Sequence, residues 1–117
     1  MDEAKGWILI ERIYGGSEKT EDGFYIDGYK VSKNQRAVFW DDREISLSKF
    51  EFDLLVYFFN NKYTVLSREQ ILEKVWGYDY YGSDRVVDDT IRRLRKKMAN
   101  VNIDTVYGCG YKLVAKQ

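Results

Sequence analysis

Apolar residues between positions 84 and 99 recur at the spacing of an α-helix. Four of them share the spacing i, i+4, i+7 and i+11: Val87, Ile91, Leu94 and Met98. At about 100° per residue they form one narrow stripe, which predicts a helix with one face packed on a core and with Ser83 or Asp84 as its N-cap. Charged residues occupy the rest of the helix surface: Arg85, Asp89, Arg92, Arg93 and Lys96 opposite the stripe, with Arg95 and Lys97 on its flanks.

Two more helices are predicted upstream, each by a capping box ahead of an apolar run. Ser48 with Glu51 opens the first, and its apolar face ends at residues 60–61: Phe52, Leu54, Leu55, Phe58 and Phe59. Ser67 with Gln70 opens the second, which Gly77 ends, and its apolar face has four members: Ile71, Leu72, Val75 and Trp76. Between them, residues 65–66 are long enough only for a bridging strand.

Short β-prone runs lie on either side of the helices. From residue 24 to 47 the runs FYI, YKVS, AVFW and REISL are separated by turns of two to three residues, which predicts an antiparallel meander. Near the end, IDTVYGCGYKLV (103–114) predicts a hairpin around Gly-Cys-Gly. We expect Ile103, Tyr111 and Leu113 to cover the core beside the last helix.

A sheet, three helices and a terminal hairpin in that order predict an α+β fold. The arrangement is that of a winged helix-turn-helix with an N-terminal antiparallel β-meander, three helices and a C-terminal β-hairpin wing. We assign residues 23–117 to this domain and residues 1–22 to a linker or N-terminal extension. The apolar patch Trp7–Ile10 in that extension fits a strand or a docking linker equally.

Composition argues against catalysis. The chain has no histidine and a single cysteine, Cys109, so it has no Ser-His or Cys-His pair, no ordinary zinc site and no internal disulfide. We therefore expect no enzymatic activity, no metal, no cofactor and no small-molecule substrate. A lone cysteine, the lack of an apolar run of about 18 residues and the lack of a secretory signal together predict a cytoplasmic protein without membrane contact.

Charge is distributed unevenly although the net charge is zero. Residues 1–60 carry 8 Lys/Arg and 12 Asp/Glu, whereas residues 61–117 carry 11 and 7. Five of the six residues from 92 to 97 are basic. A rigid row of this kind fits the DNA major groove, which admits one α-helix. Basic residues near a helix C-terminus also complement the helix dipole on a solvated face, and the helix alone does not separate the two interpretations.

Four segments resemble one known family. ISLSKFEFDLL, VLSREQILEKVWG, DRVVDDTIRRLRKK and IDTVYGCGYKL occur in the order and spacing of the DNA-binding effector domain of OmpR/PhoB-type response regulators, over about residues 24–114. The resemblance implies a bacterial two-component transcription regulator that binds double-stranded DNA as a dimer on two half-sites. It also implies that helix 84–99 enters the major groove and that hairpin 103–114 is the wing.

The resemblance assigns roles to individual residues. Arg93 is the expected base reader, because arginine pairs with guanine in a bidentate manner. The other expected DNA contacts are Trp76, Arg85, Asp89, Thr90, Arg92, Arg95, Lys96, Lys97, Thr105, Tyr107, Tyr111 and Lys112. Trp76 fits core packing equally well. The expected contact loop for RNA polymerase consists of Gly77, Tyr78, Asp79, Tyr80, Tyr81, Gly82 and Ser83, although its tyrosines are equally suited to pack back on the fold.

Acidic residues on the last helix have two interpretations. Asp89 is four residues from both Arg85 and Arg93, and Asp88 is four residues from Arg92, so helix-surface pairs are expected to orient these arginines. We favour a solvated salt ladder for Asp88. Asp89 is equally suited to accept a hydrogen bond from a cytosine amine.

Two departures from the family pattern stand out. Tyr107 occupies a wing position where the family commonly has an arginine for the minor groove, so we expect weaker or different wing readout, with Lys112 taking part of it. The family's receiver domain has no counterpart in these 117 residues. The sequence therefore fits either the excised effector half of a regulator or a stand-alone factor. A winged-helix module that docks on RNA polymerase or another acidic protein is the alternative function.

Overall fold

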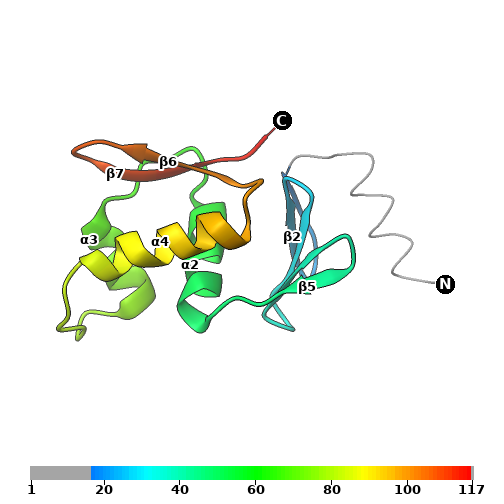
Figure 1. The fold of residues 1–117 in the computed structure, drawn as a ribbon, viewed down its shortest axis with the longest axis horizontal. Helices are drawn as coiled ribbons and strands as arrows, with labels where there is room; N and C mark the ends of the chain where they lie inside the picture. The colour runs from blue at the N-terminus through cyan, green and yellow to red at the C-terminus, as the bar shows by residue number, and fades with distance from the viewer. Residues whose placement is uncertain (1–16, 117) are drawn as a thin grey trace. The chain divides into compact units, whose positions relative to one another are not determined.

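The computed structural model describes residues 17–116 of the chain (Figure 1). These residues fall into two compact units, one comprising residues up to Ser46 together with the C-terminal end from Ala115, the other Leu47–Val114. Antiparallel strands, three helical segments and a final hairpin follow one another in the expected order. The predicted α+β winged helix-turn-helix fold is confirmed.

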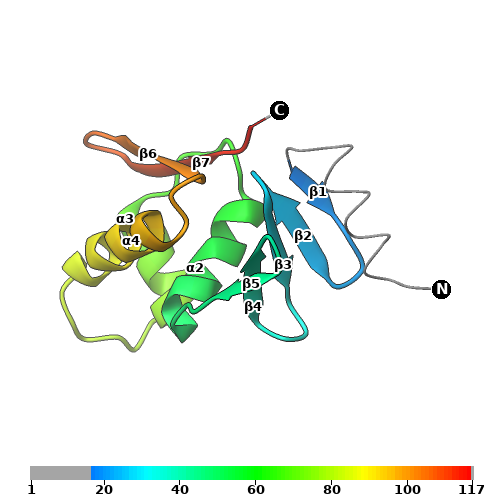
Figure 2. The ribbon, with the colours of Figure 1, turned by 45° about the vertical axis from the view of Figure 1, so that its right-hand side comes forward.

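The first unit is a five-stranded antiparallel sheet whose strands are neighbours in chain order (Figure 2). The strands are β1 (Ser17–Lys19), β2 (Gly23–Ile26), β3 (Tyr29–Ser32), β4 (Ala37–Trp40) and β5 (Arg43–Ile45). The predicted meander is therefore confirmed. β1 is an addition, because the sequence analysis placed residues 17–19 in the linker, whereas they pair with β2. The Trp7–Ile10 patch lies outside the described residues.

The turn between β2 and β3 needs a backbone that most residues avoid. Asp27 has φ 48° and Gly28 has φ 93°, as expected for a two-residue hairpin turn with an Asp-Gly sequence. A Cβ at Gly28 would lie 2.6 Å from the ring of Trp40, which itself packs on Tyr29 with ring centroids 4.8 Å apart. The C-terminal end joins this unit, since the N–H of Lys116 donates to the Asp27 carboxylate (2.8 Å).

The helices of the second unit begin where their capping boxes predict. α2 (Lys49–Asn60) has Ser48 as N-cap, and Ser48 and Glu51 exchange both capping hydrogen bonds. α3 (Arg68–Ile71) has Ser67 and Gln70 in the same reciprocal arrangement. α4 (Arg85–Lys97) has Asp84 as its N-cap without a side-chain bond. Instead the Ser83 hydroxyl accepts from the N–H of Arg85 (3.1 Å).

The second predicted helix is not α-helical throughout. After α3 the chain continues as the π-helical turn η1 (Leu72–Trp76), which ends when the N–H of Gly77 donates to the carbonyl of Leu72 (3.1 Å). Gly77 has φ 103°, a conformation that glycine adopts without strain. The expected helix stop is therefore confirmed. The wider turn was not predicted, because one π-turn barely changes the apolar spacing.

The wing is the two-stranded hairpin β6 (Asn102–Val106) and β7 (Gly110–Val114), around the predicted turn. β7 is also held by residues 65–66, as expected, because Leu66 and Tyr111 exchange two backbone hydrogen bonds of 2.8 and 2.9 Å. Gly110 is required here, since a Cβ at this position would lie 2.0 Å from the carbonyl oxygen of Leu66. The hairpin is thereby joined to the start of α3.

The predicted apolar stripe forms the buried face of α4. Val87, Ile91, Leu94 and Met98 are all 0% exposed. α4 packs against α2 and β6, and Ile103, Tyr111 and Leu113 are buried as expected. The helix is thus fixed along its length, which determines where its charged residues point.

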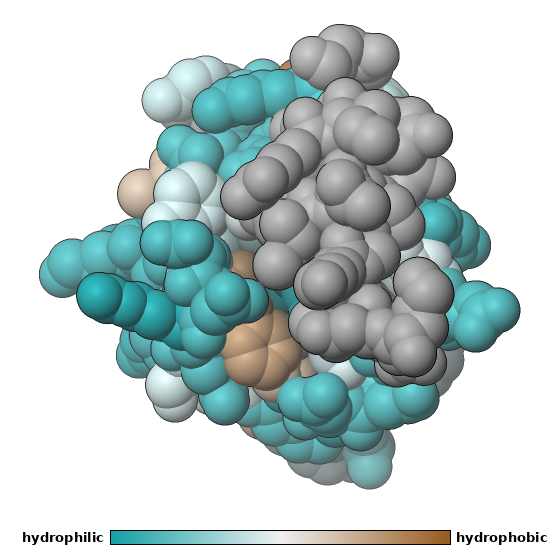
Figure 3. Space-filling model, turned by 90° about the vertical axis from the view of Figure 1, so that its right-hand side faces the viewer, coloured by the Kyte–Doolittle hydropathy of each residue, from teal (hydrophilic) through white to brown (hydrophobic). Residues whose placement is uncertain are grey.

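No helix within residues 17–116 combines the length and the apolar character needed to cross a membrane. In the view of Figure 3 the described residues are mostly hydrophilic, with a small hydrophobic area near the centre.

Candidate nucleic-acid interface

The solvent-facing side of α4 presents a row of basic side chains. Five predicted members are exposed: Arg85, Arg92, Arg93, Lys96 and Lys97. The side chains of Arg85, Arg93 and Lys96 form no hydrogen bond or ion pair with any of residues 17–116. Because the opposite face is fully buried, these three cations project from a rigid helix into solvent. They are therefore available to an anionic partner.

Asp89 is paired differently from the expectation. Its carboxylate accepts a weak, solvent-exposed bond from Arg92 (3.5 Å), three residues on, rather than from Arg85 or Arg93. An exposed pair of this length contributes little to stability. Arg92 is thus loosely oriented, while the side chain of Arg93 forms no hydrogen bond or ion pair with the described residues.

Arg95 is committed to the wing. Its Nε donates to the carbonyl of Ile103 (3.1 Å), and a terminal nitrogen donates to that carbonyl and to the Thr105 hydroxyl (2.9 Å). Its guanidinium also lies 5.6 Å from the ring centroid of Tyr111. Arg95 was expected to contact phosphate. In the structure it attaches α4 to β6, and its contact with phosphate stays a prediction.

Lys97 is also occupied within the protein. Its Nζ lies 2.7 Å from a carboxylate oxygen of Glu51, a residue only 2% exposed near the start of α2. The same oxygen accepts from the N–H of Ser48 in the capping box. An unpaired buried carboxylate is costly, so the lysine is held by this charge. Lys97 therefore forms an ion pair between α4 and α2 that the sequence analysis did not predict. Its expected contact with DNA stays a prediction.

The partners of Glu51 control its ionisation. Burial by itself would raise the pKa of the Glu51 carboxyl, but hydrogen bonds from Lys97 and from the Ser48 backbone, with the charges of Lys97 and Arg93, hold the pKa below its ordinary value. A lowered folded-state pKa stabilises the protein above the unfolded value of about 4.3. That contribution is lost as the pH falls through the folded-state pKa.

Replacing Lys97 by methionine should lower the free energy of unfolding by about 1 to 3 kcal/mol at neutral pH, because Glu51 would remain buried without its cation. Urea denaturation measures this change. Lys96→Met is the matched control, since Lys96 is exposed and forms no ion pair with the described residues, and its cost should stay within about 0.5 kcal/mol. The difference between the two variants should shrink in acid, where Glu51 is protonated. Equal stabilities at neutral pH would contradict the assigned ion pair.

Thr90 is more buried than a DNA-facing residue was expected to be. The resemblance implied that it faces DNA, but it is only 3% exposed, and its hydroxyl donates to the carbonyl of Val86 (2.7 Å). Thr90 follows Val87 by three residues and precedes Ile91 and Leu94, so it lies at the edge of the buried stripe. A contact between Thr90 and DNA stays a prediction.

Asp88 joins three elements instead of forming the expected salt ladder with Arg92. Its carboxylate accepts from Arg68 Nε at the start of α3 (2.9 Å) and from the Tyr111 hydroxyl on β7. Burial would raise the pKa of Asp88, but the bonds from Tyr111 and Arg68 and the Arg68 charge lower it below the usual range. Burial and the neighbouring carboxylate raise the pKa of Tyr111. Asp88 is therefore ionised at neutral pH.

The wing exposes some of its predicted residues and buries another. Tyr107, at the turn, is 91% exposed, and Thr105 is exposed as well. Lys112 is half-buried. Tyr111 was expected near phosphate, but it is buried with its hydroxyl on Asp88. The tip of the hairpin is thus the part that a partner can reach, and Tyr111 is internal.

Trp76 lies in an aromatic cluster. Its ring stacks on Phe50 of α2, with centroids 5.0 Å apart and planes at 15°, and Tyr80 lies 6.5 Å away. Trp76 remains half-buried, so part of its ring faces solvent. Packing and surface exposure are therefore combined at this residue.

The tyrosines of the loop 77–83 fall into two groups, one packed on the fold and one exposed for a contact surface. Tyr80 packs on Trp76, whereas Tyr78 and Tyr81 extend into solvent, the latter 98% exposed. Asp79 and Gly82 are exposed as well, and the Ser83 hydroxyl accepts from the N–H of Arg85 at the start of α4. Two tyrosines are thus available for a contact surface, and one belongs to the fold.

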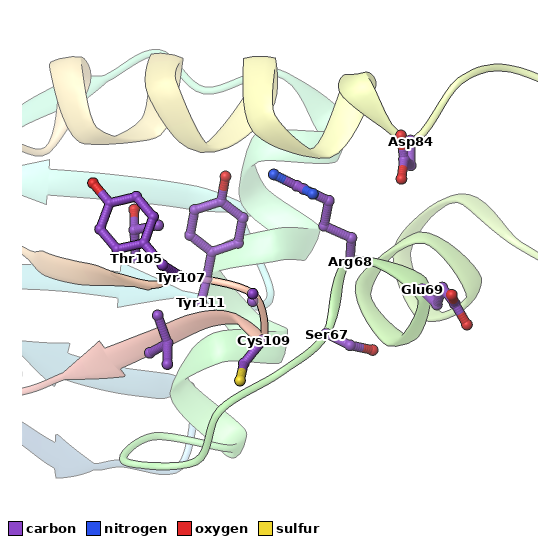
Figure 4. A pocket seen from close by; sticks show the side chains of 11 residues that line it. Ser67, Arg68, Glu69, Asp84, Thr105, Tyr107, Cys109 and Tyr111 are labelled. Carbon is purple, nitrogen blue, oxygen red and sulfur yellow. The ribbon is translucent and has the colours of Figure 1, made fainter.

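A pocket of about 370 Å³ is lined by residues of the wing and of the start of α3 (Figure 4). Its lining includes Arg68, Asp84, Thr105, Tyr107 and Tyr111. Arg68 extends from the start of α3 toward Tyr111, whereas Glu69 points away from both. Residues 17–116 contain no cluster of metal-ligating side chains.

Sequence reasoning missed three residues that shape this surface: Arg68, Phe50 and Glu51 as the partner of Lys97. The sequence pattern around each of these residues either was weak or was already explained by a local role. Arg68 and Glu51 belong to capping boxes that account for them locally, and Phe50 precedes the buried face of its helix.

Comparison with known proteins gives consistent matches. The family profile described as "Transcriptional regulatory protein, C terminal" matches residues 42–113. Transcriptional regulatory protein CssR of Bacillus subtilis (strain 168) is 46% identical over 91 residues, which cover 77% of this chain and 40% of that protein. The uncharacterized transcriptional regulatory protein YclJ of the same strain is 44% identical over 112 residues, 92% of this chain and 49% of its own. The chain thus spans less than half the length of these relatives.

Solved structures agree with the sequence matches. The crystal structure of the DNA-binding domain of B. subtilis CssR has a TM-score of 0.70 at 48% identity, covering 74% of this chain and 99% of that one. The crystal structure of the Klebsiella pneumoniae RstA DNA-binding domain in complex with the RstA box has a TM-score of 0.67 at 29% identity, covering 77% and 94%.

Proposed function

This chain belongs to the family of C-terminal domains of transcriptional regulatory proteins, and from that premise we propose that it binds specific sites on double-stranded DNA. One observation carries the proposal. Arg85, Arg93 and Lys96 project from a helix whose other face is fully buried, and their side chains form no hydrogen bond or ion pair with any of residues 17–116. A fixed helix with cations on its outer face suits the major groove. The family is one of transcription regulators and not of enzymes.

The proposed contacts divide by chemistry. Arg93 forms the bidentate pair with guanine, and Arg85, Arg92 and Lys96 neutralise phosphates. Asp89 keeps its ion pair with Arg92 and does not accept a hydrogen bond from a base. On the wing, Tyr107, Thr105 and Lys112 lie toward the minor groove, where an uncharged tyrosine supplies packing instead of charge. The uncovered part of the Trp76 ring lies against the backbone.

Two partners are proposed beyond DNA. A single winged helix buries a modest area, so two copies on adjacent half-sites would give the affinity that an operator requires. The exposed Tyr78 and Tyr81 support a contact between loop 77–83 and RNA polymerase. A transcription regulator acts where the bacterial chromosome lies, so we propose a cytoplasmic protein.

The second candidate function is a protein-binding module, and the same two exposed tyrosines favour it. Salt dependence separates the two functions. Phosphate neutralisation should make the logarithm of duplex affinity fall with the logarithm of salt by roughly 0.9 for each phosphate bound. Fluorescence anisotropy with a labelled duplex measures this slope.

We expect a slope that corresponds to several phosphates and that decreases by roughly one when Arg92 is replaced by alanine. Asp104→Asn is the control for a charge change away from α4. A shallow slope that does not respond to Arg92→Ala would favour the protein-binding function.

A further inference from the structure

Two charged side chains of α4 reach the wing from opposite ends of the helix. Asp88 and Arg95 are seven residues apart, close to two helical turns, and therefore lie on one face. Asp88 accepts from the Tyr111 hydroxyl on β7, and Arg95 donates to Ile103 and Thr105 on β6. Each strand of the wing is thus attached to the helix at a different point.

Arg68 brings the start of α3 into the same cluster. Its Nε donates to the Asp88 oxygen that also accepts from Tyr111. Figure 4 shows its side chain extending toward Tyr111 along the pocket between wing and helix. The Tyr111 ring, in turn, lies under the Arg95 guanidinium, 5.6 Å from centroid to cation. We call Arg68, Asp88, Arg95 and Tyr111 the wing bracket.

The charges in the wing bracket are poorly suited to direct DNA contact. A carboxylate on a groove-binding helix repels phosphate, and Arg95 already donates to Ile103 and Thr105. Both side chains instead satisfy polar groups of the hairpin. Their effect on DNA would therefore be exerted through the wing.

We propose that the wing bracket fixes the wing relative to α4 before DNA binds, and that Asp88 is the positioning residue that adds the wing's base pairs to the recognised site. This rests on the proposed DNA-binding function. With the hairpin preorganised, no binding energy is spent on ordering it, so contacts in the two grooves form together. Without the negative charge of Asp88, the bonds from Tyr111 and Arg68 lose their shared charged acceptor and weaken, so that the tip residue Tyr107 is no longer held in one place.

The sign of the Asp88→Asn effect tests the proposal. If Asp88 were only a negative charge near DNA, its removal would strengthen binding to every duplex. A positioning role predicts the reverse for the cognate site: affinity for it falls, while affinity for random duplex is unchanged or higher. Asp104→Asn is the matched control, because it removes an exposed carboxylate from the same hairpin and should leave the ratio of cognate to random affinity as in the wild type.

The location of the loss provides a second readout. In the wild type, a base-pair substitution beneath the wing should cost roughly tenfold in affinity, as should one beneath α4. We call these two losses in affinity the wing penalty and the α4 penalty. In Asp88→Asn and in Tyr111→Phe, the wing penalty should largely disappear while the α4 penalty remains. Tyr111→Phe keeps the ring in the core and the net charge, so it tests the hydrogen bond alone. Tyr57→Phe, which removes a hydroxyl from α2, is its control.

Three outcomes are distinguishable. Loss of the wing penalty in both variants supports the proposal. Retention of both penalties, or a uniform gain in affinity for Asp88→Asn, overturns it while leaving the DNA-binding function intact. If the wild-type protein has no sequence preference, the proposed function fails and the positioning role fails with it. Hydroxyl-radical footprints of the same complexes report directly whether the wing's contact is lost.

Discussion

Replacing Arg93 by alanine is expected to flatten the preference between a cognate site and a random duplex. A bidentate arginine–guanine pair supplies about 1 to 3 kcal/mol of discrimination, or roughly 5- to 150-fold. Arg93 is the arginine of the basic row that is exposed, central and without a hydrogen-bond partner among residues 17–116. Competition binding with the two duplexes at one salt concentration measures the change.

Arg92→Ala is the matched comparison for Arg93→Ala. Arg92 is the adjacent arginine, loosely paired with Asp89, and its assigned role is to bind phosphate. Its removal should lower the affinity for both duplexes by a similar factor, because phosphate contacts carry no sequence information. If both alanine variants lost affinity equally on both duplexes, the distinction between base reader and phosphate contact would be wrong.

Replacing Leu94 by alanine is expected to lower the free energy of unfolding by about 2 to 5 kcal/mol. Leu94 is fully buried in the middle of the stripe that fixes α4, and α4 packs against α2 and β6. The substitution removes buried methyl groups and leaves a cavity that the surrounding side chains fill only in part. Urea denaturation followed by circular dichroism measures the loss.

Leu94→Met is the control for this stability change. It roughly conserves side-chain volume, so it should cost less than about 1.5 kcal/mol. The stripe interpretation also predicts that Leu94→Ala weakens DNA binding under conditions in which the substitution unfolds α4. Arg93→Ala, by contrast, should leave the free energy of unfolding almost unchanged. A stability loss for Leu94→Ala no larger than that for Arg93→Ala would contradict the anchoring role of the stripe.

The features that sequence analysis predicted correctly have local causes. The stripe Val87, Ile91, Leu94 and Met98 follows helix periodicity, and both capping boxes connect residues three positions apart. The hairpin follows from its Gly-Cys-Gly turn. In each case a short stretch of chain contains both partners of the interaction, so the printed sequence is sufficient to predict it.

The contacts that sequence analysis did not predict join charged side chains to partners that are distant in sequence. Lys97 pairs with Glu51, 46 residues away, and Asp88 binds Arg68 and Tyr111, 20 and 23 residues away. Helix-surface rules consider only neighbours three or four positions apart. These rules therefore placed Asp88 in a salt ladder and left Lys97 free for DNA.

Two structural features escaped prediction for a different reason. β1 has the polar sequence SEK and lacks the alternation of a strand, so only its pairing with β2 identifies it. Thr90 was assigned to DNA because of a family position rather than from its own environment. Its place beside the buried stripe and its bond to Val86 became evident only in three dimensions.

Selection of random duplexes by the purified protein tests the central claim most directly, because it examines binding and sequence preference together. The account predicts enrichment of one motif, with its strongest positions beneath α4, and loss of those positions when the selection is repeated with Arg93→Ala. If the wild-type protein enriched no motif, or if Arg93→Ala recovered the same motif with undiminished strength, the claim that α4 reads DNA sequence would be contradicted.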